Sequence, residues 1–144
     1  MGVGNSFMPR PGRFGTQPVP LTSGRINTGT LAAGTQNHNI GAMAATCVVS
    51  RFTISAEVYP TAATSCTLQL IKMTGGTALA LTAAVDINAK TANVPITVSV
   101  TGTLTDSERT LRPGDSLRLA LVTVGAVSVQ PDDLVGVAEL LVQD

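Results

Sequence analysis

Charged side chains are scarce in this chain of 144 residues. Asp, Glu, Lys and Arg make up 12% of it, about half the share of roughly 25% that is usual in soluble domains. Nine acids and nine bases give a formal net charge of zero. A nucleic-acid partner is therefore not expected, because binding to phosphates requires excess positive charge. A surface with so few charges is poorly soluble alone, which indicates that part of it is covered in an assembly.

Aromatic and catalytic side chains are also few. The chain has one Tyr, three Phe, no Trp and one His, whereas sugar-binding and base-stacking surfaces rely on exposed aromatic rings. His38 lies in a polar stretch that we predict to be a loop, with no local partner for catalysis. We therefore predict a protein that is not an enzyme and has no catalytic residues.

Two cysteines, Cys47 and Cys66, occur in strand-like apolar surroundings. We expect two buried free thiols, with a disulfide between neighbouring strands as the alternative. Two Cys and one His cannot complete a tetrahedral zinc site, so we expect no metal and no cofactor. No apolar run is long enough for a membrane span or a secretory signal, and we expect no membrane partner.

The first 25 residues differ from the rest of the chain. They contain four of the eight prolines and three arginines, and no acid. This composition favours extended backbone without an apolar face. The pattern predicts an extended N-terminal arm over residues 1–25 and one domain over residues 26–144. Phe7 and Phe14 favour an arm that lies along a partner over a solvated tail.

From residue 26 onward the chain is typical of β-structure. Apolar and polar residues alternate with period two in several segments, as in strands with one buried face. Threonine, with 20 residues, and valine, with 16, favour pleated sheet. We predict an all-β fold, a single sandwich of about seven or eight strands; the segments are 26–31, 40–49, 52–58, 66–70, 79–87, 96–100, 117–121 and 135–142.

Two local motifs predict other elements. Thr105 and Glu108 have the spacing of a capping box, which predicts a single helical turn. Arg112-Pro113-Gly114-Asp115 predicts a type II turn, with Gly114 at the position of positive φ.

The carboxylates within these motifs, and two others, allow further interpretations. Asp106, Glu108 and Asp115 could serve a hydrolase as acid and base, but no aromatic residue lies near them to hold a sugar. A surface ion-pair network or an inter-subunit contact is the better interpretation. Asp132-Asp133 after Pro131 predicts a solvated turn rather than a calcium site, because calcium requires more oxygen ligands.

The few charges are sorted by sign along the chain. Residues 1–51 contain four arginines and no acid, whereas residues 52–144 contain five bases and nine acids. The first section carries +4 and the second −4. A basic arm on an acidic body is suited to docking on an acidic surface, either a neighbouring copy or a scaffold.

The arm, the Thr/Ala/Val-rich body and the closing stretch LTDSERTLRPGDSLRLALVTVGAVSV together resemble the capsid decoration, or cement, proteins of tailed bacteriophages. The resemblance covers the layout of the whole chain and implies a jelly-roll-like body. It implies a homotrimer on the capsid exterior, made in the host cytoplasm, that binds major capsid subunits and stabilises the shell. The arm contacts would fall to Phe7, Arg10, Arg13, Phe14 and Arg25.

The alternative is a receptor- or glycan-binding β-sandwich module of a fibre or adhesion protein. That function needs an exposed recognition patch in loops, with Tyr59 or His38 as its anchors. Periodicity does not reveal strand order, so a jelly roll and other sandwiches remain open at this stage.

Overall fold

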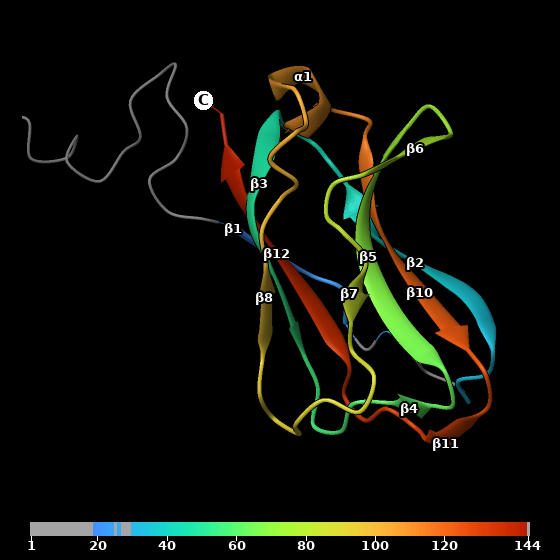
Figure 1. Cartoon of the computed structure of the whole chain (residues 1–144). Helices are drawn as coiled ribbons and strands as arrows, with labels where there is room; N and C mark the ends of the chain where they lie inside the picture. The colour runs from blue at the N-terminus through green and yellow to red at the C-terminus, as the bar shows by residue number, and fades with distance from the viewer. Residues whose placement is uncertain (1–18, 25, 27–29, 144) are drawn as a thin grey trace, which may run out of the picture.

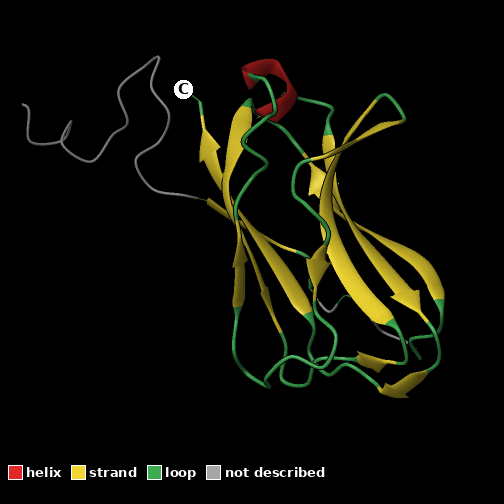
Figure 2. Ribbon diagram, in the orientation of Figure 1, coloured by secondary structure: helices red, strands yellow, loops and turns green. Residues whose placement is uncertain are grey.

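A computed structural model describes residues 19–24, 26 and 30–143 as two antiparallel sheets packed face to face (Figures 1 and 2). The first sheet has the order β1-β12-β3-β8, with β9 also paired to β3. Its strands are β1 (Val19–Thr22), β12 (Val135–Val142), β3 (Cys47–Ser55), β8 (Ile96–Val98) and β9 (Thr110–Leu111).

The second sheet has the order β2-β10-β5-β6, with β7 also paired to β5. Strands β4 (Thr61–Ala62) and β11 (Val127–Val129) form a small ribbon at one end of the molecule. The strands of the second sheet are β2 (Gly34–Ala42), β10 (Ser116–Val124), β5 (Ser65–Thr74), β6 (Thr77–Ala80) and β7 (Val85–Asp86).

This strand order is that of a jelly roll. When the eight principal strands are numbered along the chain, one sheet reads 1-8-3-6 and the other 2-7-4-5. Successive strands thus alternate between the sheets, except that strands 4 and 5 (β5 and β6) form a hairpin within one sheet, as in two Greek keys. The predicted all-β sandwich is confirmed, and the alternative left open by periodicity is resolved.

The core lies between the sheets and follows the predicted alternation. Leu117, Leu119 and Leu121 of β10 are fully buried, and so are Phe52 and Ile54 of β3. On β5, Cys66, Leu68 and Leu70 point into the same core. Burial of these alternating side chains is the main free-energy gain that holds the two sheets together.

Both short motifs form as predicted. Helix α1 (Asp106–Arg109) is one turn, and Thr105 and Glu108 cap it reciprocally. In the turn before β10, Gly114 has φ +94°, and the Asp115 amide donates to the Arg112 carbonyl at 3.0 Å. Among the described residues no helix is long and apolar enough to cross a membrane.

Three expectations require correction. His38 lies in strand β2 rather than in a loop. Residues 79–87 form two short strands, β6 and β7, because the alternation is interrupted where Ala83 and Ala84 are exposed. Residues 40–49 include the end of β2, a connection and the start of β3, and are not one strand.

Strand β1 lies within the range predicted as an arm. It pairs with β12, with Pro20 opposite Glu139. Proline lacks an amide donor and is tolerated in edge strands such as this one. The sheet therefore begins at Val19, earlier than the predicted start of the body at residue 26. Residues 1–18 and Arg25 lie outside the described residues, so an arm there stays a prediction.

Candidate functional site

The five residues predicted to bind a partner, Phe7, Arg10, Arg13, Phe14 and Arg25, all lie outside the described residues. Their position and contacts are therefore untested. The fourth arginine of the basic section, Arg51, lies on β3 and belongs to the body. The positive charge of the predicted arm thus rests on three arginines.

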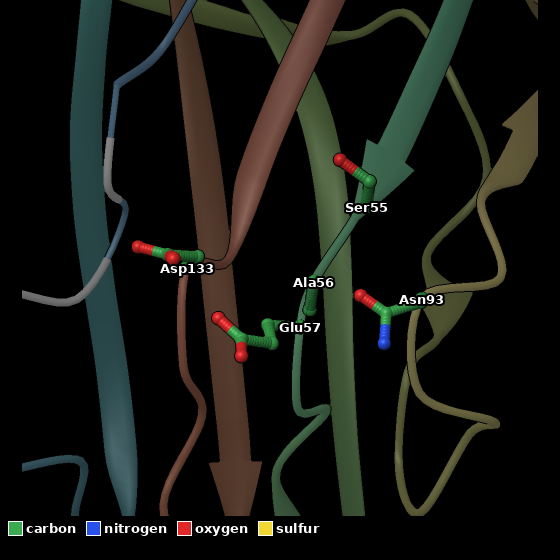
Figure 3. Close-up of a pocket in the computed structure, with 5 residues that line it drawn as sticks. All are labelled: Ser55, Ala56, Glu57, Asn93 and Asp133. Atoms are coloured by element: carbon green, nitrogen blue, oxygen red, sulfur yellow. The ribbon is translucent and has the colours of Figure 1, made fainter.

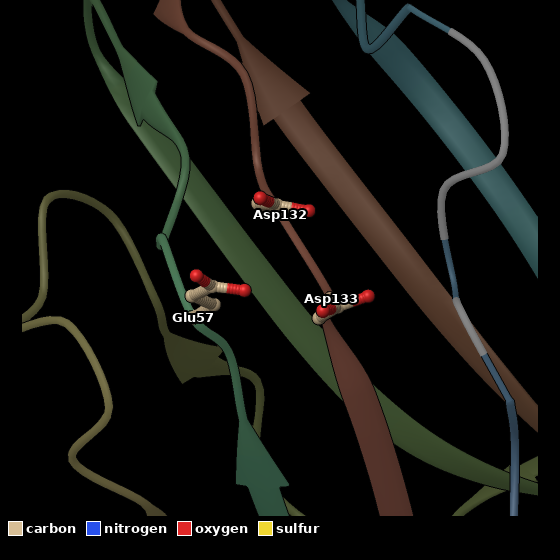
Figure 4. A group of neighbouring side chains, drawn as sticks. All are labelled: Glu57, Asp132 and Asp133. Carbon is tan, nitrogen blue, oxygen red and sulfur yellow. The ribbon is translucent and has the colours of Figure 1, made fainter.

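An acidic cluster lies at the end of the sandwich opposite α1. Glu57 follows β3, and Asp132 and Asp133 precede β12; their carboxylate oxygens lie within 4.8 Å of one another (Figure 4). Hydrogen bonds from the Glu57 and Val58 amides to the Asp132 carbonyl, at 2.9 and 3.1 Å, hold the two segments together. No local sequence pattern reveals this cluster, because Glu57 and Asp132 are 75 positions apart in the sequence.

An open hollow of about 320 Å³ adjoins the cluster and is lined by Ser55, Ala56, Glu57, Asn93 and Asp133 (Figure 3). Glu57, Asn93 and Asp132 are exposed to solvent. A hard cation such as Ca²⁺ takes six to eight oxygen ligands, and the Asp132 carbonyl oxygen already accepts two amides. Three carboxylates on an open surface do not by themselves make a metal centre.

Two of the three carboxylates considered for acid–base chemistry, Glu108 and Asp115, have structural roles at the α1 end, and the third, Asp106, is exposed to solvent. The Glu108 side chain accepts a hydrogen bond from the Thr105 amide at 2.7 Å, and Asp115 accepts from the Arg112 amide at 2.9 Å. Asp115 is almost completely buried. Neither group is placed to exchange protons with a substrate in the described structure.

A buried lysine joins this end to the second sheet. Lys72 of β5 is 7% exposed. Its Nζ donates to the carbonyl oxygens of Ser107, Glu108 and Thr110 at 3.3, 3.1 and 2.8 Å. These contacts satisfy carbonyls that the end of a helical turn leaves without partners. The described acids and bases of this end form no salt bridge with one another, so the expected surface ion-pair network is not seen there. The alternative, an inter-subunit contact, stays a prediction.

The anchors of the alternative binding function are not exposed side chains in loops. Tyr59 is 2% exposed, and its hydroxyl donates to the Val94 carbonyl at 2.7 Å. Phe52 is completely buried. The described part of the chain therefore presents no aromatic ring to a glycan, and the expectation for Tyr59 was wrong.

Both cysteines are free and buried, as expected. Burial raises the pKa of the Cys47 thiol, and the negative charge of Asp115 adds to the effect. Burial also raises the pKa of Cys66. Thiols that stay protonated are poor nucleophiles and poor metal ligands, so these residues serve the core.

The outer face of the first sheet carries few charges. Arg51 and Glu139 form a bidentate ion pair at its centre, with Arg51 Nη2 2.9 Å from Glu139 Oε1. Exposed pairs of this kind contribute little to stability. The other side chains on this face of β12 are Val135, Val137 and Leu141, which are half-buried. This face of β12 is thus mostly apolar, whereas the outward positions of β3 next to it include Thr53 and Ser55.

The edges of the sheets differ in length. Strand β2 has nine residues and pairs only with β10, whereas the edge strands β1, β6 and β8 have four, four and three residues. β2 contains no proline and no Asp, Glu, Lys or Arg. Proteins usually protect long edges with such residues, so β2 is an open pairing edge in the described structure.

No protein-family model matches this chain, and no curated protein matches it in sequence. Solved structures do match it, and they share its fold. A chain in the capsid of Ralstonia phage GP4 is 13% identical, with a TM-score of 0.59 over 98% of this chain and 93% of that one. A chain in the capsid asymmetric unit of cyanophage Pam1 is 16% identical, with a TM-score of 0.50 over 100% and 98%. The predicted resemblance is confirmed at the level of the fold.

Proposed function

We propose that this chain is a structural virion protein that decorates the exterior of a phage capsid and stabilises it. The observation that carries the proposal is the jelly roll shared, over nearly the full length of both chains, with proteins from two phage capsids. The proposed partner is the major capsid protein.

The described chemistry supports a role without catalysis. The candidate acids Glu108 and Asp115 accept backbone hydrogen bonds, and the thiols of Cys47 and Cys66 are buried. The largely neutral faces can be buried against other proteins without leaving unpaired ions behind. These properties are those of a part in an assembly.

In this proposal the N-terminal arm makes the capsid contact through Phe7, Arg10, Arg13 and Phe14, together with Arg25, which follows β1 in the sequence. Three arginines without a neighbouring acid favour an acidic partner surface, and the two rings supply apolar area. The protein acts as a homotrimer, because three arms on one body multiply weak contacts through effective concentration.

The test is co-sedimentation with empty shells assembled from the major capsid protein of the phage that encodes the chain. The full chain should sediment with the shells, and Arg10→Ala/Arg13→Ala should weaken binding at least tenfold, a loss typical of removing two interfacial charges. The control Lys90→Ala/Arg112→Ala removes two exposed charges from the body and should bind normally.

Light scattering of the purified protein should give three times the 14.7 kDa of one chain. A full chain that does not sediment with shells under any condition would refute the proposed function. If both double variants bind shells equally well, the role of the arm is refuted, but the decoration function is not.

A further inference from the structure

The open edge of β2 has a regular stretch that can accept another strand. From Thr35 to Asn39 the register with β10 is uninterrupted; the irregularity comes after it, at Ile40. The opposite side of β2 meets no strand among the described residues. An extended segment that adds there would gain main-chain hydrogen bonds over the whole stretch.

A buried polar atom without a partner lies at the centre of this stretch. His38 pairs with Leu119, which is fully buried, so both side chains point to the core side of the sheet. The Nε2 atom of His38 is buried and has no hydrogen-bond partner in the described structure. Buried polar atoms are nearly always satisfied by protein groups or by ordered water, so a polar side chain added at this edge would find a partner in Nε2.

The symmetry of the proposed homotrimer limits what can occupy the edge; this step rests on the proposed function. Pairing of β2 with β2 of another copy would create a two-fold axis and a dimer. In a three-fold ring each contact joins two different surfaces. The occupant is then another segment of the neighbouring copy.

The sequence before β1 contains one segment suited to pairing. Residues 1–8 have no proline and no charged residue, whereas Pro9, Pro11 and Pro18 interrupt the stretch that follows. Val3, Asn5 and Phe7 alternate with the small residues Gly4 and Ser6. As a strand, the segment would place its two apolar side chains on one face with Asn5 between them.

We propose that residues 2–8 of one copy add as a strand to β2 of the next copy, with Asn5 facing His38. Val3 and Phe7 then flank the open edge of the core, where Ile40 and Leu21 are partly buried. Residues 9–18 connect this strand to β1 and span up to roughly 35 Å when extended, which is enough to reach a neighbour. In this arrangement Phe7 packs on the neighbouring copy and no longer contacts the shell, whereas Arg10, Arg13, Phe14 and Arg25 stay available to the shell.

The first experiment is disulfide trapping in the full chain. Asn5→Cys is combined in turn with Gln36→Cys, His38→Cys or Ile40→Cys, because one of these three lies opposite residue 5 in any centred register. The native cysteines are buried and do not compete. The control combines Asn5→Cys with Ala78→Cys, which is exposed on β6 at the other edge of the same sheet.

At least one β2 pair should form covalent dimers and trimers on oxidation, as seen by non-reducing electrophoresis, and the control should stay monomeric. If no β2 pair is cross-linked more than the control, the proposal is wrong. Cross-linking within a single chain would refute exchange between copies, since the segment would then lie on its own β2.

The second experiment measures amide exchange in a protein of full length. Val3→Pro/Asn5→Pro removes two donors from the added strand, and Gly12→Pro/Gln17→Pro adds the same number of prolines outside it. In the trimer, whether free or on shells, exchange of Thr35–Asn39 should be about tenfold or more faster in the first variant only. Equal exchange in wild type and both variants would overturn the proposal.

Shell co-sedimentation of Val3→Pro/Asn5→Pro separates the two proposals. If this variant binds shells and the amide exchange of its β2 equals that of the wild type, the added strand is refuted. The decoration function is then unaffected. Wild-type protein that fails to bind shells refutes the decoration function whatever the exchange pattern.

Discussion

Gly136 allows the closing strand to pack closely on the core. A Cβ atom at this position would lie 2.8 Å from Cδ1 of Leu119 and 3.0 Å from Cε1 of Phe52. Both neighbours are fully buried, so neither can move without disturbing the opposite sheet. The small residue on the inner face of β12 lets Phe52 fill the space between the sheets.

We predict that Gly136→Ala lowers the free energy of unfolding by about 1–3 kcal/mol, since overpacking a tight core forces side chains off their rotamers. Gly102→Ala is the matched control because a Cβ there meets nothing within 4 Å. Urea denaturation of the two variants provides the measurement. Equal stability of both would contradict the packing described for β12.

Asp115 makes the stability of the α1 end depend on pH. Burial alone would raise the pKa of its carboxyl. Hydrogen bonds from the Arg112 amide and the Thr74 hydroxyl, and the charges of Lys72 and Arg112, outweigh burial, so the pKa lies below its usual value. A lowered pKa means that the ionised form stabilises the folded state.

This stabilisation is complete above the ordinary carboxyl pKa of about 3.9 and is lost as pH falls through the lower folded-state value. We predict that Asp115→Asn makes the free energy of unfolding less dependent on pH in that acid range. Denaturation at a series of pH values measures it. Asp106→Asn, at an exposed carboxyl, should keep the wild-type dependence; identical slopes for all three proteins would refute the role of Asp115.

At the level of elements, the single turn of α1 depends on its caps. Thr105 Oγ1 accepts from the Glu108 amide at 3.2 Å, and the Glu108 carboxylate accepts from the Thr105 amide. Four residues cannot form a stable helix alone. The capping box at one end and Lys72 at the other therefore hold the turn in place.

We predict that Thr105→Ala lowers the free energy of unfolding by about 1 kcal/mol, the usual loss for an N-cap. Thr105→Ser keeps the hydroxyl and should retain most of the stability. Chemical denaturation, with amide exchange at Glu108 as a local probe, distinguishes them. If the two variants are equally unstable, the cap is not what holds the turn.

Strands that bury one complete face were predictable; of the edge strands, β8 was predicted, whereas β1 and most of β2 were not. β3, β5 and β10 alternate because they cross the core, where every second side chain is enclosed. β2 is a polar edge strand, so His38 and its neighbours gave no apolar period and indicated a loop. The acidic cluster was missed for another reason: Glu57 joins Asp132 and Asp133 only because the ends of β3 and β12 meet in the fold.

For the whole molecule, the distribution of charge leads to a prediction about salt. Arg51 is already paired with Glu139, so attraction to an acidic shell rests on the arginines of the proposed arm. Binding to shells should weaken steeply as salt is raised from about 0.05 to 0.5 M, because exposed charges are then screened. The urea midpoint of the protein should change little over that range.

The control for this prediction is Arg10→Ala/Arg13→Ala, whose weaker binding should depend less on salt. Co-sedimentation across the salt series gives both dependences. Wild-type binding that is insensitive to salt would show that apolar contacts, and not the arginines, attach the protein.

The all-β class, the capped turn and the type II turn follow from the sequence, because each is set by neighbours within a few residues: alternation, a side-chain cap, or a glycine at positive φ. Only the tertiary structure shows the strand order, the open edge of β2 and the burial of Tyr59. They depend on which distant segments pair, and hydrogen bonding between strands leaves no period in the sequence. Whether a strand is enclosed or lies at an edge is a property of the assembled sheets, and here it determines which surfaces remain for a partner.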